Sequence, residues 1–271
     1  MAVLLLVDFN NLAYTSGRRT ASPHQLARRV LAKSRTPARL VGATHIAFAA
    51  DNDRLNPNYA GSLAEMRFPQ ARTILEGLGY PCYQLAGSSA DDLLVSLAIA
   101  AEAAGFERVV VLSGDRDLLA AVGGRRDLLK IHHRVGQTRY VRWTPESLSR
   151  RYKVTPDQLD DIRVLGTRQI GPRQVPAIID GRTASALLAR HGSVNALYDH
   201  LAAVGPAGLR DRLAAMEPEA RRRQALLRTR AQLPCVIDMS AGCLGDEVGL
   251  AHFEPSFTGY DRVTLLDPRP I

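Results

Sequence analysis

The chain has 271 residues, of which 46% are hydrophobic and 23% charged, a composition typical of a soluble globular protein rather than a disordered one. No apolar run reaches the roughly 18 residues that a membrane span needs. The apolar residues 3–7 run straight into Asp8 without the basic flank of a signal peptide. Three cysteines without metal-ligand spacing fit a reducing compartment, so we expect a cytoplasmic protein that does not bind membranes.

The charge indicates the class of partner. A formal net charge of +8 and a pI near 9.8 favour a polyanion. The cations are clustered: no acidic residue occurs between Asp8 and Asp51, where seven Lys and Arg residues lie. Two further basic clusters follow, over residues 125–153 and 221–230. Solvated arginine faces would also give such clusters, but a phosphate-binding site would need positive surroundings of this kind.

The first half of the chain alternates strands with helices. The hydrophobic pattern predicts strands over residues 3–7, 44–50, 81–85 and 108–112, and helices over residues 25–34, 62–78, 90–104 and 117–122. Strands separated by helices indicate βαβ units, so we expect an α/β fold with a parallel sheet and helices on both faces. Residues 127–132 and 138–142, joined around Gly136, are expected to form a hairpin at the sheet edge.

After Thr144 the pattern becomes purely helical. Thr-Pro pairs begin predicted helices that reach Tyr152 and Leu165. A stretch rich in Gly and Pro then precedes predicted helices over residues 183–191, 193–201, 208–216 and 218–231. We therefore divide the chain into an α/β domain, a helical region and an irregular C-terminal tail that packs on the core, over residues 1–143, 144–235 and 236–271.

Six aspartates follow the predicted strands one after another: Asp8, Asp51, Asp91, Asp92, Asp115 and Asp117. The carboxyl ends of the strands of an open parallel sheet meet at one edge, where ligands bind. Like charges gathered there repel one another unless a cation compensates. Carboxylate oxygens select Mg²⁺ or Mn²⁺, and two such ions roughly 4 Å apart support phosphodiester hydrolysis. The spacing therefore predicts a catalytic divalent-metal site.

Single members of this set have simpler explanations. An aspartate at the start of a helix is most often a cap, which would account for Asp91 or Asp117 alone. Asp8 is harder to explain in this way, because a carboxylate directly after five apolar residues lies near the core and needs a partner. The metal-site prediction therefore depends on the set as a whole.

At these aspartates the sequence resembles the 5′-nuclease superfamily, which includes flap endonucleases, phage 5′–3′ exonucleases and the 5′-nuclease domain of bacterial DNA polymerase I. The likeness lies in LLLVDFNNLAY at residues 4–14, ADDLL at 90–94 and SGDRDLL at 113–119. Residues 142–145, 152–161 and 182–194 look like that family's helix–three-turn–helix DNA-binding element. The resemblance covers roughly residues 1–235, and its strength lies in the order and spacing of the motifs.

The resemblance implies a PIN-like α/β domain followed by DNA-binding helices, and Mg²⁺- or Mn²⁺-dependent hydrolysis of DNA near a 5′ end or flap. Five aspartates match ligands of the family's first metal, Asp8, Asp51, Asp91, Asp92 and Asp115, and Asp117 matches a contributor to the second. By the same likeness Tyr59, Arg168, Arg182 and Thr183 would contact DNA. We expect a monomer whose partner is branched or 5′-ended DNA.

The sequence also departs from the family pattern. Ser89 stands where the family has a glutamate, and Arg168 and Gly171 stand at the positions of two second-metal acids. A glycine-rich hairpin is replaced by PAIIDG at residues 176–181, and no cation follows Tyr59 until Arg67. The helix–three-turn–helix element is therefore degenerate and the second metal site incomplete, which would impair catalysis.

Three functions are consistent with this pattern. The first is a metal-dependent 5′–3′ exonuclease or flap endonuclease that acts on DNA. The second is a DNA-structure binding protein of the same fold with weakened catalysis, which the departures at Ser89, Arg168 and Gly171 favour. The third is a PIN-type ribonuclease, which would explain the first-metal aspartates but not the likeness of the helical region.

Overall fold

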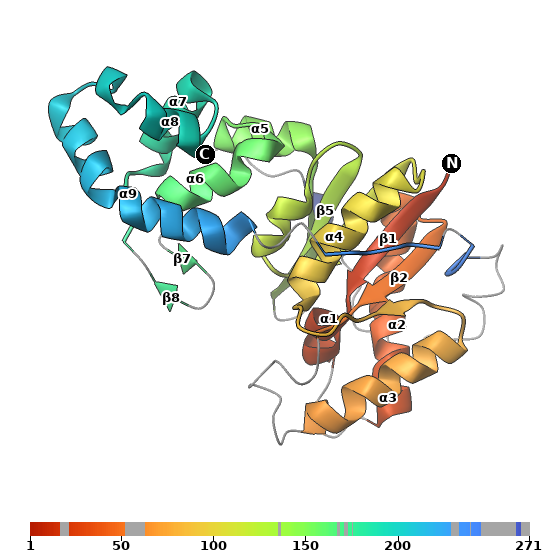
Figure 1. Ribbon diagram of the computed structural model, residues 1–271. Helices are drawn as coiled ribbons and strands as arrows, with labels where there is room; N and C mark the ends of the chain where they lie inside the picture. Colours follow the sequence, from red (N-terminus) through yellow and green to blue (C-terminus); the bar gives the residue numbers. More distant parts are fainter. Residues whose placement is uncertain are drawn as a thin grey trace. The chain divides into compact units, whose positions relative to one another are not determined.

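The computed structural model describes residues 1–16, 22–51, 63–134, 137–166, 169–170, 173–174, 176–228, 233–238, 240–244 and 264–266. The chain divides into two compact units (Figure 1). The first contains Met1–Thr144 and the described parts of Arg230–Pro268, and the second is built from Pro145–Thr229. Within the described residues, no helix is both long enough and apolar enough to cross a membrane.

A mixed sheet forms the centre of the first unit, in the order β3-β2-β1-β4-β5-β6-β9. The parallel part contains β1 (Val3–Asp8), β2 (His45–Ala49), β3 (Cys82–Tyr83), β4 (Arg108–Ser113) and β5 (Arg126–Arg134). β6 (Gln137–Trp143) pairs with β5 in antiparallel orientation, so the predicted hairpin is confirmed. β1 lies between β2 and β4, which places the chain segments that follow these three strands at one edge.

The C-terminal tail is not irregular throughout, so this part of the prediction was wrong. β9 (Thr264–Leu266) joins the sheet in parallel with β6, with Tyr140 opposite Leu265. The outer edge of β6 would otherwise present unpaired N–H and C=O groups, and pairing with β9 satisfies them. The predicted hairpin is consequently not at the edge of the sheet.

Helices cover both faces of this sheet (Figure 1). The hydrophobic core on one face joins residues of β1, β2, β4 and β5 to α1 (Phe9–Ser16), α2 (Pro23–Val41) and α3 (Leu63–Gly77). α4 (Ala90–Ala103) contacts β1, β2 and β4, and also η1, the 3₁₀ turn Asp117–Ala121. α1 was not predicted, and α2 continues beyond the predicted residue 34 because Pro37, Ala38 and Val41 are buried.

The second unit is almost entirely helical. It contains α5 (Pro145–Tyr152), η2 (Pro156–Gln158), α6 (Leu159–Gly166), α7 (Gly181–His191), α8 (Val194–Asp199), η3 (Leu201–Ala203) and α9 (Ala207–Arg228). A short antiparallel pair, β7 (Gln169–Ile170) and β8 (Arg173–Gln174), lies between α6 and α7 in the chain.

α9 replaces the two helices that were predicted over residues 208–216 and 218–231. Pro218 lies inside it and removes one backbone hydrogen bond. Leu213, Ala220 and Leu227 are buried at a spacing of seven residues, which places them on one face of the helix. Burial of this face offsets the cost of the proline, so the local break signal was misleading.

Candidate metal centre

Asp8 ends β1 and is almost fully buried, with 4% of its surface exposed. Because α1 begins at the next residue, Asp8 caps this helix: the backbone N–H of Asn11 donates to Asp8 Oδ1 at 2.9 Å. The hydroxyl of Ser113, at the end of the neighbouring β4, donates to Asp8 Oδ2 at 2.6 Å. Both carboxylate oxygens are therefore held in place by groups from two segments.

The Asp8 carboxyl has an unusual pKa. This pKa is raised from 3.8 to about 6: burial is the largest cause, the negative charges of Asp51 and Asp115 also raise it, and the hydrogen bonds from Ser113 and Asn11 oppose the rise. The carboxylates of Asp51 and Asp115, which follow β2 and β4, therefore lie close enough to Asp8 to repel its charge. A charged Asp8 carboxylate is therefore costly at this edge unless a cation compensates it.

Asp51 follows β2 and joins it to the start of α4. Its Oδ1 accepts a hydrogen bond from the backbone N–H of Ala90 at 2.7 Å. Its own backbone N–H donates to Asn10 Oδ1 at 3.1 Å. These bonds bring the first turn of α4, which carries Asp91 and Asp92, to the edge where Asp8 lies.

Ser89, at the position where the resembling family has a glutamate, is the N-cap of α4. Its hydroxyl oxygen accepts from the Asp92 N–H at 3.2 Å, and its O–H donates to Asp92 Oδ2 at 2.9 Å. One oxygen of the Asp92 carboxylate, Oδ2, is thus already hydrogen-bonded to the capping serine. A capping serine fixes the start of the helix but adds no negative charge to the edge.

Asp115 and Asp117 lie in the turn that links β4 to η1. The backbone N–H of Asp115 donates to Ser113 Oγ at 3.0 Å, and the N–H of Asp117 donates to Asp115 Oδ1 at 2.8 Å. Residue 114 lies so close to the side chain of Asn11 that a Cβ atom there would be only 3.0 Å from Asn11 Oδ1. Glycine, which has no Cβ, permits this approach. The Gly114 N–H donates to that oxygen at 3.1 Å.

The six predicted aspartates are not arranged as a preformed metal coordination site. Within the described ranges, no three Asp, Glu, His or Cys side chains are grouped so that they could hold a metal ion. Asp8, Asp51 and Asp115 interact as charges, whereas Asp91, Asp92 and Asp117 reach the same edge through α4 and η1. The donor chemistry nevertheless fits a hard cation, because the trio offers oxygen ligands whose negative charges repel one another.

The polar residues that hold these aspartates were not predicted from the sequence. Asn10, Asn11 and Ser113 link the ends of β1, β2 and β4, and Lys130 approaches Asp115 and Asp117 from β5. Two signals were available. A pair of asparagines two and three residues after a buried aspartate is costly in a core unless it makes specific bonds, and a small Ser-Gly pair precedes Asp115.

The residues predicted to contact DNA lie in several places. Tyr59 and Arg168 are outside the described residues. Arg182 is exposed in the first turn of α7. The Thr183 hydroxyl donates to Asp180 Oδ2 at 2.6 Å, and the N–H groups of Arg182 and Thr183 each donate to Asp180 Oδ1 at 3.0 Å. A phosphate at this helix end would compete with the Asp180 carboxylate.

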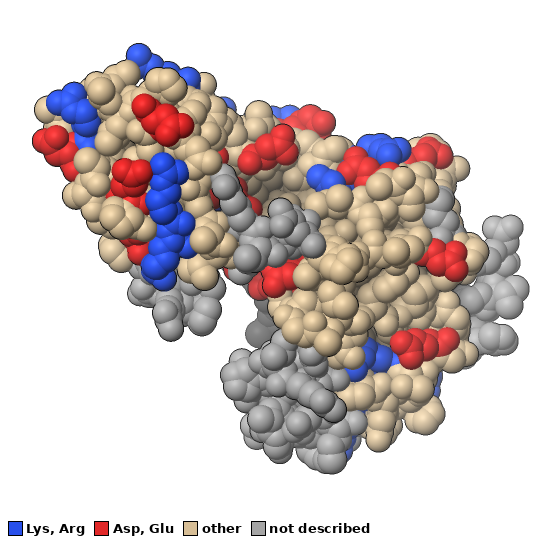
Figure 2. All heavy atoms as spheres, viewed as in Figure 1, with Lys and Arg blue, Asp and Glu red and all other residues tan. Residues whose placement is uncertain are grey.

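The basic cluster on α9 is largely neutralised. Arg221 pairs with Glu217 at 3.0 Å, Arg222 with Glu219 at 2.8 Å and Arg223 with Glu219 at 2.7 Å. Figure 2 shows basic and acidic side chains interspersed on the visible face of the helical unit, not a continuous basic surface. This cluster therefore contributes less to phosphate attraction than its sequence suggested.

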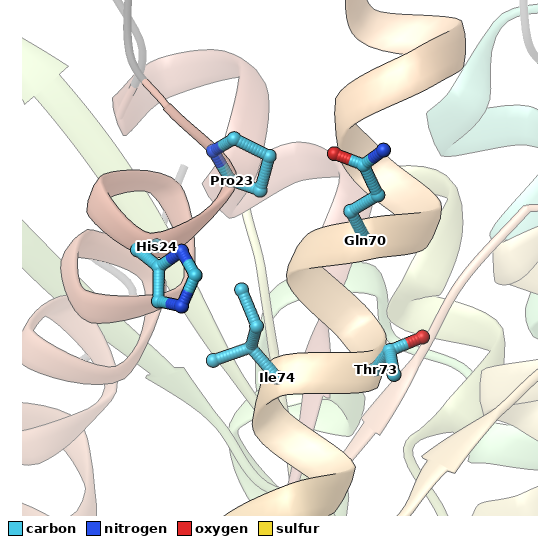
Figure 3. A pocket seen from close by; sticks show the side chains of 5 residues that line it. All are labelled: Pro23, His24, Gln70, Thr73 and Ile74. Carbon is cyan, nitrogen blue, oxygen red and sulfur yellow. The ribbon is translucent and has the colours of Figure 1, made fainter.

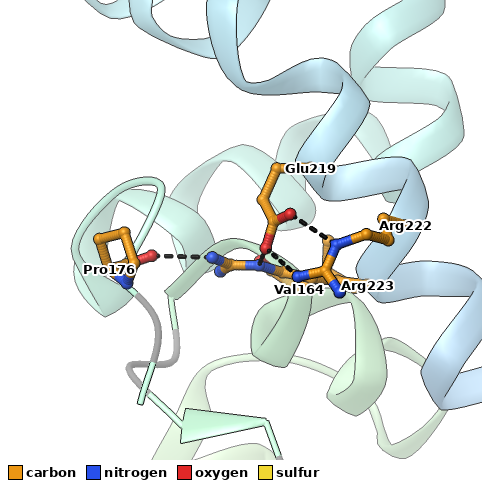
Figure 4. Close-up of polar contacts among 5 residues, drawn as sticks. All are labelled: Val164, Pro176, Glu219, Arg222 and Arg223. Carbon is orange, nitrogen blue, oxygen red and sulfur yellow. Dashed lines mark hydrogen bonds and ion pairs between the residues drawn. The ribbon is translucent and has the colours of Figure 1, made fainter. Parts of the chain in front are cut away.

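Arg223 has a structural role. Its side chain has 0% exposure, and its guanidinium donates to the carbonyl oxygens of Val164 at 3.2 Å and Pro176 at 2.9 Å, besides Glu219 (Figure 4). These carbonyls lie on either side of residues 166–175 in the chain. Arg223 thus holds Val164 and Pro176, which lie at the two ends of the segment between α6 and α7, close to each other.

A pocket of about 470 Å³ lies between the start of α2 and the middle of α3. Its lining contains Pro23, His24, Gln70, Thr73 and Ile74, with the side chains of His24 and Ile74 between the two helices (Figure 3). No carboxylate is among these lining residues, and none of the six predicted aspartates lines the pocket.

Comparison with known proteins identifies relatives by sequence, although no protein-family model matches the chain. DNA polymerase I of Mycobacterium leprae is 34% identical over 175 residues, which are 59% of this chain and 19% of that protein. The thermostable DNA polymerase I of Thermus thermophilus is 33% identical over 186 residues, which are 67% of this chain and 21% of that protein. The chain spans about a fifth of the length of these curated relatives.

Solved structures with the same fold include two proteins in complex with DNA. A complex of the bacteriophage T5 flap endonuclease with DNA and metal ions matches with a TM-score of 0.63 and 16% identity, covering 84% of this chain and 89% of that chain. Human GEN1 in complex with Holliday junction DNA matches with a TM-score of 0.54 and 16% identity, covering 87% and 63%. At these identities the likeness is one of fold.

Proposed function

We propose that this chain, which belongs to the 5′-nuclease superfamily, hydrolyses DNA phosphodiester bonds near 5′ ends or flaps with a divalent metal ion, Mg²⁺ or Mn²⁺. The observation that carries the proposal is the buried Asp8, held at the sheet edge with Asp51 and Asp115 acting on its charge. Carboxyl groups whose pKa is raised by burial and by neighbouring carboxylates are typical of functional sites. The T5 flap endonuclease, which has the same fold, was solved with metal ions and DNA.

The chain's own residues would hold and orient the cation. Asp8, Asp51 and Asp115 would be the ligands, since their charges already interact. Asn11 and Ser113 hold the Asp8 carboxylate, and Ala90 holds that of Asp51, so only small side-chain movements would be needed for these ligands to bind the ion. A bound divalent ion would supply Lewis-acid stabilisation of the negative charge that develops on the scissile phosphate.

The helical unit would bind the DNA backbone. We assign to it a degenerate helix–three-turn–helix element that extends from α6 through β7 and β8 to α7, within a DNA-binding region over residues 144–235. The exposed Arg182 would contact a phosphate, and we keep Tyr59, Arg168 and Thr183 as further proposed contacts. Arg223 would keep the two ends of this element together.

The test uses a 5′-labelled flap DNA, a matched single strand and an RNA of the same sequence, each with Mg²⁺, Mn²⁺ or EDTA. We expect cleavage of the flap DNA with either metal, and none in EDTA. Binding that weakens with salt but yields no product would contradict hydrolysis and support a DNA-structure binding protein. Ser89, which caps α4 where the resembling family has a glutamate, favours this second candidate because it adds no negative charge to the edge. Cleavage of RNA alone would support a PIN-type ribonuclease.

A further inference from the structure

A buried lysine lies at the same sheet edge as the aspartates. β5 runs parallel to β4, and Lys130 is directly opposite Ser113 in the register. Side chains opposite each other on neighbouring strands project from the same face of the sheet. On that face the Ser113 hydroxyl donates to Asp8 at 2.6 Å and accepts from the Asp115 N–H at 3.0 Å. Lys130 is therefore next to the residue that organises the carboxylates.

The surroundings of Lys130 are unusual for a lysine. Only 9% of its surface is exposed, and its chain neighbours Leu129 and Ile131 belong to the hydrophobic core on the opposite face. Burial lowers the Lys130 pKa and the nearby Arg116 lowers it further, whereas the negative charges of Asp115 and Asp117 raise it. A buried ammonium group requires compensation by nearby charge, and these two aspartates are the acids that interact with it.

We propose that Lys130 is a positioning residue whose ammonium group acts as a fixed cation beside Asp115 and Asp117, and so disfavours a second divalent ion near Asp117. The inference rests on the proposed metal-dependent function. One positive charge from the protein neutralises part of the carboxylate cluster, which makes a second divalent ion near Asp117 less favourable. The chain would thus depend on fewer bound ions than its six aspartates suggest.

The test measures Mn²⁺ binding without DNA, by calorimetry and by the electron paramagnetic resonance signal of free Mn²⁺. Wild type is compared with Lys130→Met and Lys130→Arg. We expect Lys130→Met to bind a further ion, or to bind Mn²⁺ about tenfold more tightly, because one nearby repulsive charge is removed. Lys130→Arg should behave as wild type, since it keeps the charge. The methionine retains the apolar stem, and thermal unfolding verifies that each variant is folded.

Lys33→Met is the matched control. It removes the same charge from α2, where the Lys33 ammonium donates to the Thr15 carbonyl at 2.8 Å. It should leave Mn²⁺ binding unchanged. Equal affinity and stoichiometry in wild type and Lys130→Met would overturn the role of Lys130 and leave the proposed metal site intact. Absence of Mn²⁺ binding in every variant would overturn both, whereas Mn²⁺ binding without DNA cleavage would contradict only the proposed activity.

Discussion

Replacing Asp8 with asparagine should reduce DNA cleavage by about 100- to 1,000-fold, and should also stabilise the metal-free protein. The loss of rate follows from removing a charged ligand of the proposed cation, because electrostatic stabilisation of the transition state contributes orders of magnitude. The gain in stability follows from removing a charge that is unfavourable chiefly because it is buried, and also because Asp51 and Asp115 repel it. Single-turnover cleavage of flap DNA and urea unfolding in EDTA measure the two effects.

The sign of the stability effect depends on how folding changes the Asp8 pKa. The ordinary pKa of an aspartate is 3.8, and that of Asp8 in the folded protein is about 6. The folded state binds more protons than the unfolded state between these values, so the free energy of unfolding falls as pH rises from about 4 to about 6. Two pKa units correspond to about 3 kcal/mol, and the penalty is complete above about pH 6. Asparagine carries no such penalty, so Asp8→Asn should gain about 1–2 kcal/mol at pH 8 after weaker hydrogen bonds are allowed for.

Asp127→Asn is the matched control for this variant. Asp127 is also a buried residue, with 5% exposure, but it forms an ion pair in which Arg142 Nη2 lies 2.6 Å from Asp127 Oδ2. Removing its charge should destabilise the protein by about 1–3 kcal/mol and leave cleavage intact. Full activity of Asp8→Asn would contradict the proposed site. Equal destabilisation of both variants would contradict the electrostatic account of Asp8.

Arg223→Met should destabilise the helical unit by about 3–5 kcal/mol, because it leaves groups buried without their charged partner. The Arg223 side chain has 0% exposure. It forms an ion pair with Glu219 and donates hydrogen bonds to the carbonyl oxygens of Val164 and Pro176. Urea unfolding monitored by far-ultraviolet circular dichroism gives the free energy. Affinity for flap DNA should fall as well, since Arg223 holds both ends of the proposed DNA-binding element.

Arg222→Met separates this role from a general loss of charge on α9. Arg222 pairs with the same Glu219 at 2.8 Å, yet 54% of its side chain is exposed. Solvent-exposed pairs contribute little, so this variant should retain nearly the wild-type stability. If Arg222→Met and Arg223→Met were equally destabilised, the carbonyl contacts of Arg223 would not be the cause.

Much of the site follows from local sequence. The apolar strands β1 and β4 end at Asp8 and Ser113, and the order of strands and helices places the aspartates at one edge before any coordinates are known. What could not be predicted are the bonds across that edge. The contact of Ser113 with Asp8 depends on the register of β4 against β1, and the place of Lys130 opposite Ser113 depends on that of β4 against β5. No local pattern specifies either register.

The errors in the predicted fold also arise from contacts between distant parts of the chain. Pro218 predicted a break, but α9 continues through it because burial of one helix face outweighs a single lost hydrogen bond. β9 has only three residues, and its strand conformation depends on pairing with β6, which lies more than a hundred residues earlier in the chain. Tertiary contacts decided both elements against their local signals.

The most direct test of the proposed metal centre is an anomalous difference map from crystals of the full chain soaked in Mn²⁺. We predict a peak whose nearest protein atoms are carboxylate oxygens of Asp8, Asp51 and Asp115. This result would require small side-chain movements from the arrangement in which no three donors are grouped. A map without a peak at this edge, at a Mn²⁺ concentration that saturates DNA cleavage, would contradict the account.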